Sequence, residues 1–338
     1  MWVVWRQQRS IVIAFALLAV VVSMWALLMG LHEQTLWREF LSPPCKGEFG
    51  GLIASNATFC EHLQSSLFNS GKLNNVVISI GLAFAPLFGL ILGVNAVAHE
   101  IEQKTIRLAW TQSGSRVRWL TNKYLASVVS LVVILAPLCW LFSWWVGASH
   151  DAARITQKIF AISGFVEVAC GIFCFALAVV IGLFLRRPGW SLAVGIVLFA
   201  AIFLGCTTEV LPNLGSPSVA VLQNTQQGKG SSVGFYSSGG VPADSWPLWT
   251  GYEPKREKSV PSHSLMNRLT TNMNRCQASE TPSLTESYCA KQLGLTHIQL
   301  YIPGNQFWTL QFFEGGFYLI AAALLAALSL FAVRKVKQ

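Results

Sequence analysis

Residues 97–123 read VAHEIEQKTIRLAWTQSGSRVRWLTNK, and the rest of the chain is organised around this stretch. It is a polar interval between two apolar runs, residues 76–96 and 124–146. Its acidic and basic side chains are Glu100, Glu102, Lys104, Arg107, Arg116, Arg118 and Lys123. An apolar run of about 20 residues crosses a bilayer as a helix. We therefore expect residues 97–123, hereafter the coupling segment, to be a charged helix that joins two membrane spans and offers a docking surface.

The composition of the whole chain is that of a membrane protein. Hydrophobic residues make up 53% of its 338 residues and charged residues only 12%, about half the charged fraction of a soluble domain. The net charge is +9, which raises the alternative of nucleic-acid binding. The basic residues lie at the ends of apolar runs, as in membrane proteins, and no basic patch interleaved with aromatic residues occurs. We expect no nucleic-acid partner.

The apolar runs predict an all-α membrane protein with six transmembrane helices and a small outer lobe between the last two spans. The predicted spans are residues 11–31, 76–96, 124–146, 159–185, 190–210 and 312–333. An even number of spans places both termini on one side. The short segments on that side carry most of the clustered basic residues, namely Arg6, Arg9, the residues of the coupling segment, Arg186, Arg187, Arg334, Lys335 and Lys337. The positive-inside rule then predicts a multi-pass protein of the cell membrane with both termini cytoplasmic.

The first ten residues pair Trp2 and Trp5 with Arg6 and Arg9. This pattern fits a short interfacial helix on the membrane surface, and it fits equally well a simple flank of the first span. The apolar run of residues 11–31 is too long for the core of a signal peptide, and no small-residue cleavage site follows it. We expect this run to be retained as a span.

Two outer segments are long enough to carry structure, residues 32–75 and 207–311. They divide the chain into spans one to five (1–206), an extracellular lobe (207–311), and a last span with a basic tail (312–338). In the lobe, the sequence GKGSSVGFYSSGGVPADSWP predicts irregular structure. Residues 264–298 contain enough Leu, Met and Tyr for short helices.

The eight cysteines fall into two groups of four. Cys139, Cys170, Cys174 and Cys206 lie within or at the end of spans, where we expect them to pack. Cys45, Cys60, Cys276 and Cys289 lie in the outer segments, where disulfides persist. Four cysteines allow three pairings, and the near pairs Cys45–Cys60 and Cys276–Cys289 are the most economical. A zinc site is the alternative, but no CxxC spacing supports it, so we expect no metal.

Glu167 is the acidic residue that lies well inside a predicted span. An ionisable group at such a depth marks a substrate path or a partner contact; the alternative is a polar contact between helices, and a membrane enzyme using Glu167 has little support. Glu314 lies at the outer mouth of the last span. Gly89 and Gly93 form a GxxxG pattern that permits close helix packing.

Motifs for nucleotide hydrolysis and for hydrolase chemistry are absent from the sequence. No GxxxxGK[ST] phosphate loop occurs, and neither a GxSxG elbow nor an HExxH pair is found. We therefore expect this chain not to be an enzyme, and to hold no catalytic residues and no cofactor of its own.

Two segments resemble a known family. AHEIEQKTIRLAWTQSGSRVRWLTNKYL, which begins at Ala98, is similar to the cytoplasmic segment of type-two ABC exporter permeases of the actinobacterial kind, although Lys104 replaces a common Gly. YIPGNQFWTLQFFEGGFYL, residues 301–319, looks like the family's entry into its last span. The six spans and the long final outer segment agree with the resemblance.

The resemblance implies a permease subunit that pairs with a second permease copy or homologue and with separate ABC ATPase subunits. ATP and Mg would be bound by those partners, and alternating access would move a substrate outward. The residues that we expect to couple the chain to the ATPase subunits are Glu100, Glu102, Thr105, Arg107, Thr111, Arg116 and Arg118. Few charges in the spans favour a hydrophobic or amphipathic substrate. The alternative function is a membrane sensor whose outer lobe binds a ligand and signals through the same segment.

Overall fold

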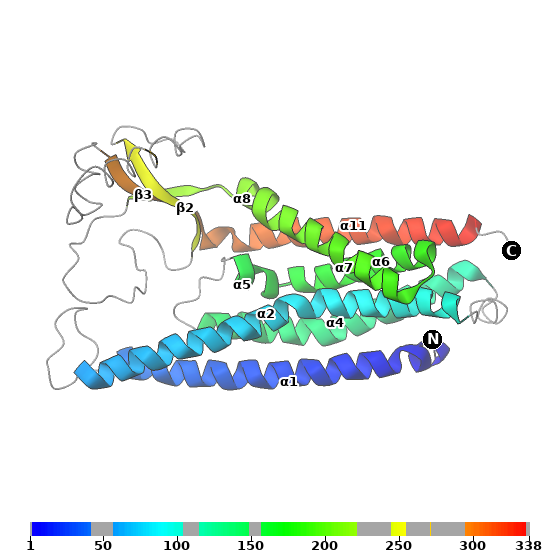
Figure 1. Cartoon of the computed structure of the whole chain (residues 1–338), viewed down its shortest axis with the longest axis horizontal. Helices are drawn as coiled ribbons and strands as arrows, with labels where there is room; N and C mark the ends of the chain where they lie inside the picture. The colour runs from blue at the N-terminus through cyan, green and yellow to red at the C-terminus, as the bar shows by residue number, and fades with distance from the viewer. Residues whose placement is uncertain are drawn as a thin grey trace.

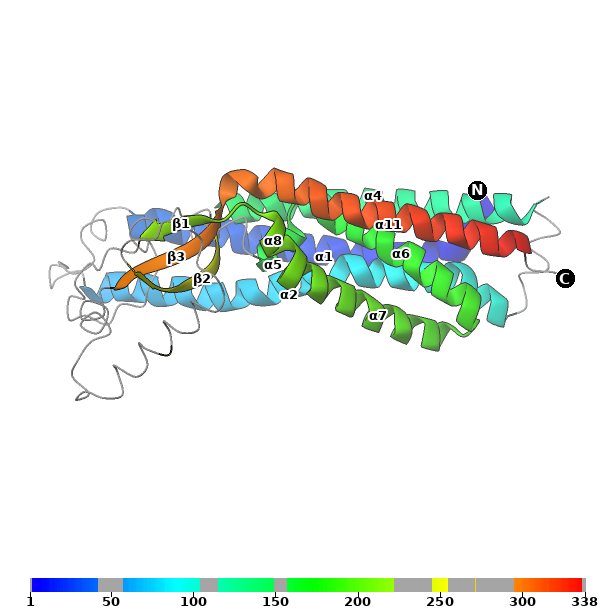
Figure 2. The ribbon, with the colours of Figure 1, turned by 90° about the horizontal axis from the view of Figure 1, so that it is seen from above.

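The structure is a computed structural model, and it describes residues 2–41, 57–103, 115–148, 157–221, 245–254, 271 and 295–335. Six long helices run along one axis of the molecule (Figures 1 and 2). They are α1 (Trp2–Leu41), α2 (Ala57–Glu102), α4 (Arg116–Ala148), α6 (Val166–Leu185), α7 (Pro188–Gly205) and α11 (Phe307–Lys335). Each carries a segment long and apolar enough to cross a membrane. The predicted six-span helical architecture is therefore confirmed.

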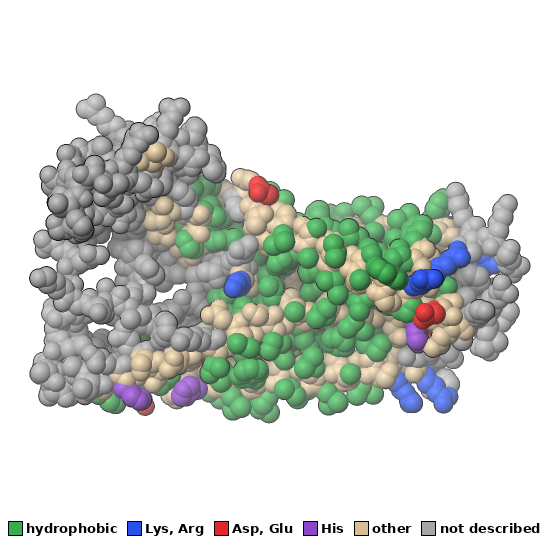
Figure 3. Space-filling view, in the orientation of Figure 1, with side chains coloured by type: hydrophobic (Ala, Val, Ile, Leu, Met, Phe, Trp, Pro, Cys, Tyr) green, Lys and Arg blue, Asp and Glu red, His purple; other side chains and the backbone are tan. Residues whose placement is uncertain are grey.

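Both chain termini lie at one end of the bundle, and a small sheet lies at the other end (Figure 1). On the face shown in Figure 3, a broad band of hydrophobic side chains covers the middle of the bundle, and Lys and Arg side chains gather at the end that carries the termini. We call this end the inner end and the opposite one the outer end. The apolar band matches the hydrocarbon layer that the spans would cross.

The fourth predicted span is not one continuous helix. Residues 157–162 form the short helix α5 (Gln157–Ile162), and α6 begins only at Val166. Gly164 lies in the break with φ of +82°, a backbone conformation that Gly adopts without steric penalty. The fifth span ends in a π-helical turn, Cys206–Val210, followed by the short helix α8 (Leu211–Leu214). Apolar periodicity alone did not reveal either irregularity.

Helix α1 begins at Trp2 and continues without a break to Leu41. Residues 2–10 are thus continuous with the helix of the first span. This supports the alternative that they flank the span, and the alternative of a separate interfacial helix is wrong. Beyond its apolar part, α1 packs against the start of α2. Leu36, Trp37, Leu63 and Leu67 form a small core there. The outer segment of residues 32–75 is therefore largely a helical hairpin.

Helix α2 packs closely against α6 in the centre of the bundle. A Cβ atom placed at Gly93 would lie 2.5 Å from the carbonyl oxygen of Phe175 and 2.7 Å from the Cβ of Ala178. Gly89 faces the carbonyl of Gly171 in the same way. Small residues let two helix backbones approach in a membrane, so the close packing expected from the GxxxG pattern is confirmed.

The outer end carries a three-stranded antiparallel sheet in the order β1-β3-β2. Its strands are β1 (Ser218–Val221), β2 (Ser245–Pro254) and β3 (Leu295–Pro303). Ser218 lies opposite Tyr301, and Trp246 lies opposite Ile302. The start of β2 falls in a stretch that we expected to be irregular, and β3 overlaps the end of one that we expected to be helical. The hydrophobic cluster formed by Phe160, Leu211, Trp246, Ile302, Phe307 and Leu310 packs this sheet against the bundle.

The cysteines of the spans are buried free thiols at positions 139, 170, 174 and 206. Cys60 is buried in the first turn of α2. Its predicted partner Cys45 lies outside the described residues, as do Cys276 and Cys289. Both proposed disulfide pairings therefore stay predictions.

Candidate functional site

The coupling segment is described at its two ends. Glu100 and Glu102 belong to the last turn of α2, and Arg116 and Arg118 belong to the first turn of α4. Thr105, Arg107 and Thr111 lie outside the described residues. The two ends are therefore continuous with two helices that are long and apolar enough to span a membrane.

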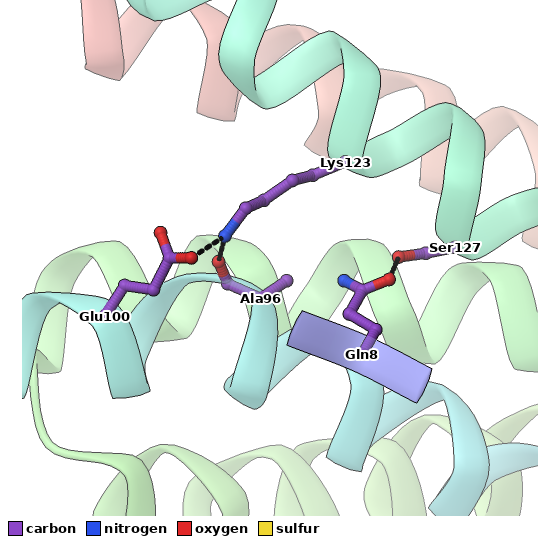
Figure 4. Close-up of polar contacts among 5 residues, drawn as sticks. All are labelled: Gln8, Ala96, Glu100, Lys123 and Ser127. Carbon is purple, nitrogen blue, oxygen red and sulfur yellow. Dashed lines mark hydrogen bonds and ion pairs between the residues drawn. The ribbon is translucent and has the colours of Figure 1, made fainter. Parts of the chain in front are cut away.

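A buried ion pair joins these two helices. The Nζ atom of Lys123 lies 2.5 Å from Oε1 of Glu100, and it also donates a hydrogen bond of 2.5 Å to the carbonyl oxygen of Ala96 (Figure 4). Lys123 is 1% exposed and Glu100 is 6% exposed. The ammonium group also lies 4.6 Å from the ring centroid of Trp119, one turn earlier in α4. A charge pair with further hydrogen bonds is the form in which burial of two ions is tolerated.

The first span is tied to the same place. Ser127, one turn after Lys123, donates a hydrogen bond of 3.2 Å to the side-chain oxygen of Gln8 in α1 (Figure 4). Tyr124 and Ser329 share a hydrogen bond of 3.0 Å that links α4 to α11. We call Gln8, Ala96, Glu100, Lys123 and Ser127 the polar joint. It holds three spans together at the inner end of the bundle.

Glu100 therefore does not have the position expected of it. We predicted that its charge would meet a partner protein, yet its carboxylate is buried against Lys123 of the same chain. From the sequence, Lys123 was only one of the basic residues of the coupling segment, and we did not predict an ion pair for it. A lysine two turns into an apolar helix is a usable signal, but a single sequence does not name its acidic partner.

Other residues of the coupling segment are accessible. The side chains of Glu102 and Arg118 are exposed, and Arg116 is partly exposed. The Oγ atom of Ser115 accepts a hydrogen bond of 3.2 Å from the backbone N–H of Arg118. Ser115 is thus the N-cap of α4. Exposed charges of both signs at two fixed helix ends form a surface that another protein can recognise.

Glu167 lies in the first turn of α6, directly after the break. It is 3% exposed, and its Oε2 atom accepts a hydrogen bond of 3.4 Å from the thiol of Cys139 in α4. This hydrogen bond is the polar contact between helices that we gave as one of the two hypotheses for Glu167. Its Oε1 atom has no hydrogen-bond partner among the described residues, so the contact leaves part of the carboxylate unexplained.

Gln311, which we did not single out from the sequence, fixes the break before α6. Its Nε2 atom donates hydrogen bonds of 2.8 Å to the carbonyl oxygens of Phe160 and Ser163. Its Oε1 atom accepts one of 3.2 Å from the backbone N–H of Val166. Helix ends leave backbone groups without hydrogen-bond partners. Here the buried side chain of Gln311 provides the partner for three such groups.

The same segment, residues 301–319, also attaches the sheet. The side chain of Gln306 exchanges two hydrogen bonds of 2.8 Å with the backbone N–H and carbonyl of Ser216. Glu314 and Tyr318, one turn apart in α11, line a small cavity together with Glu167. Among the described residues, no group of three or more His, Cys, Asp or Glu side chains is placed to hold a metal ion.

A comparison with protein families identifies the relationship. The model of the family described as ABC-2 membrane transporter related matches residues 14–210, which is more than half of the chain. The match covers most of the first span, the next four spans, the whole coupling segment, and every residue of the polar joint except Gln8. No curated protein and no solved structure matched the chain. With a family match of this extent over the spans and the charged segment between them, the chain belongs to the ABC-2 membrane transporter related family.

Proposed function

We propose that this chain is the membrane permease subunit of an ATP-driven exporter and that separate ABC ATPase subunits bind its coupling segment. The family supports the permease role and an ATPase partner. ATP and Mg are bound by those partners. A second permease, either another copy or a homologue, completes the pathway. The cargo is a hydrophobic or amphipathic molecule that moves outward.

The observation that carries this proposal is the polar joint. Helix α2 ends at Glu102, two residues after Glu100, and α4 begins at Arg116, two turns before Lys123. The ion pair between Glu100 and Lys123 clamps the two helices near these ends. A partner that pushes on residues 103–115 therefore moves α2 and α4 as one unit. Since α2 packs on α6 through Gly89 and Gly93, the push reaches the centre of the bundle.

The proposal includes the direction of the chain in the membrane. Arg186 and Arg187, between α6 and α7, are exposed at the same end as the termini and the coupling segment. By the positive-inside rule this end faces the cytoplasm. A reporter fused after residue 338 is expected to be active only inside the cell, and activity only outside would contradict the orientation.

The test of the ATPase partner uses the exposed charges of the coupling segment. Glu102→Ala and Arg118→Ala are expected to reduce recovery of the ATPase subunits with the tagged permease, or to uncouple ATP hydrolysis from transport in proteoliposomes. A charge left unpaired in an interface costs about 2–5 kcal/mol of binding, whereas a solvated surface charge contributes less than about 0.5 kcal/mol.

Two exposed charged residues in the outer half of the bundle serve as matched controls. Glu209 and Lys158 are equally exposed there, and Glu209→Ala and Lys158→Ala are expected to change neither recovery nor coupling. All four variants should reach the membrane at normal levels. If the two inner substitutions leave recovery, hydrolysis and transport unchanged, the coupling role is wrong and the sensor alternative gains support.

A further inference from the structure

A small cavity lies among α2, α5, α6, α7 and α11 in the outer half of the bundle. Its polar lining comes from Glu167 of α6 and from Glu314 and Tyr318 of α11. Phe199 and Phe203 of α7 form an apolar wall, with ring centroids 5.7 Å apart. The cavity admits a group about the size of one water molecule.

Apart from Oε2 of Glu167, which contacts Cys139, the polar side-chain atoms of Glu167, Glu314 and Tyr318 are poorly satisfied. Glu167 and Glu314 are each 3% exposed, and Tyr318 is 1% exposed. Oε1 of Glu167 has no hydrogen-bond partner among the described residues, and the carboxylate of Glu314 and the hydroxyl of Tyr318 have at most each other. Buried polar groups are almost always hydrogen-bonded. The acceptors around this cavity are therefore short of donors.

A proline of α2 also lies at this cavity. Pro86 lies inside α2, and because proline has no N–H it cannot donate the helical hydrogen bond to the carbonyl of Leu82, four residues earlier. Leu82 and Pro86 both line the cavity. The polar lining thus combines two carboxylates and a hydroxyl, and most of these atoms are acceptors.

We propose that this cavity binds the protonated primary amine of a transported amphiphile. An ammonium group has three donors and no acceptor, which complements a lining of acceptors. Its positive charge compensates carboxylates that are costly to bury alone in a membrane, and the aromatic wall adds cation–π attraction. The first turn of α6 helps to retain a negative Glu167, since the N-terminal end of a helix favours anions.

The size of the cavity limits how large the cationic head group of the ligand can be. A primary ammonium is about as large as a water molecule, whereas a trimethylammonium group is several times larger. The apolar tail of the ligand extends along Phe199 and Phe203 toward the lipid-facing side of α7. As a statement about cargo, the proposal rests on the proposed permease function; as a statement about binding, it stands on the cavity.

The experiment measures equilibrium binding of radiolabelled hexylammonium to the full chain in lipid nanodiscs, with empty nanodiscs subtracted. Hexylammonium is expected to bind saturably, and unlabelled 1-hexanol and hexyltrimethylammonium are expected to compete at least about tenfold more weakly. Glu167→Gln and Glu314→Gln keep the side-chain shape and remove the charge. Each is expected to weaken binding about tenfold or more.

The matched control is Glu33→Gln. Glu33 is also a buried carboxylate, but it lies in the outer hairpin, where it accepts hydrogen bonds from Ser70 and Asn74. Its substitution is expected to leave hexylammonium binding unchanged. Should a glutamate variant fail to fold, Tyr318→Phe serves instead, with an expected loss of about two- to tenfold from one hydrogen bond.

Two outcomes would overturn the proposal: unchanged binding in the glutamine variants, or competition by 1-hexanol as strong as by hexylammonium. Either outcome leaves the permease function intact, because binding is measured on the chain alone, without an ATPase. Conversely, loss of the ATPase interaction leaves the ammonium site intact.

Discussion

Lys123 Nζ lies 2.5 Å from Glu100 Oε1, so the last turn of α2 and the second turn of α4 share a buried ion pair. We predict that Lys123→Met alone lowers the free energy of unfolding by about 3–5 kcal/mol, because it leaves the Glu100 carboxylate buried without its cation. The double variant Glu100→Gln with Lys123→Met should recover most of that loss. Reversible unfolding in mixed detergent, analysed as a double-mutant cycle, measures both values.

Arg118→Ala is the control for this prediction, since Arg118 lies in the same helix but is exposed. It should change the unfolding free energy by less than about 0.5 kcal/mol. If the single Lys123 variant behaves like the Arg118 variant, the ion pair does not hold the two helices together.

Gln311 is expected to be the most important uncharged polar residue at the outer end. Gln311→Leu removes the partners of three backbone groups, the N–H of Val166 and the carbonyls of Phe160 and Ser163. Each buried group left without a partner costs about 1–3 kcal/mol. We expect a clear fall in the thermal midpoint and faster amide exchange at residues 163–166.

Gln306→Leu provides the contrast. Gln306 also makes two hydrogen bonds with the backbone, but these are exposed, so water can replace them. Its substitution should lower the midpoint far less. Equal effects of the two substitutions would contradict the role given to burial.

Gly93 is expected to tolerate no side chain. In Gly93→Ala the new Cβ would meet the carbonyl of Phe175 at 2.5 Å and the Cβ of Ala178 at 2.7 Å, so α2 and α6 must separate. Gly316→Ala in α11 is the control, because a Cβ at that position meets nothing within 4 Å. Overpacking typically costs about 1–3 kcal/mol. Unfolding midpoints of the two variants should therefore differ, and a similar midpoint would show that the two helices separate at little cost.

The outer cysteines remain open to a direct test. Peptide mapping without reduction is expected to find Cys45 linked to Cys60 and Cys276 linked to Cys289. Each bridge closes a loop of about 15 residues, which in the chain-entropy model stabilises the fold by about 3 kcal/mol. A crossed pairing would contradict only the connectivity, whereas four free thiols would contradict disulfide formation itself.

The spans could be predicted from the sequence because membrane solvation imposes a strong and local pattern. Each helix must satisfy its own backbone in hydrocarbon and must present about 20 apolar residues. The GxxxG pattern in α2 was equally local, and its close packing against α6 followed. Ser115 could be proposed as a cap because capping depends only on neighbouring residues.

What could not be predicted depends on distant pairs. Glu100 reads as a surface charge until α4 brings Lys123 beside it, and Gln311 reads as an ordinary polar residue until α5 and α6 end next to it. The strands β1 and β3 are separated by more than 70 residues along the chain. Short, weakly alternating segments gave little indication of strand pairing, and Trp246 and Ile302 show their packing role only once the sheet is formed.

Helix α2 has a mechanical consequence. It runs unbroken for 46 residues from Ala57 to Glu102, which at about 1.5 Å per residue is about 69 Å. The bilayer core spans only about 30 Å, so one continuous helix, with Pro86 inside it, connects the inner ion pair with the outer hairpin. A tilt of one degree about the Glu100 end displaces the Ala57 end by about 1.2 Å. A small change in the angle between α2 and α4 at the inner end thus produces a much larger displacement of the hairpin outside the membrane.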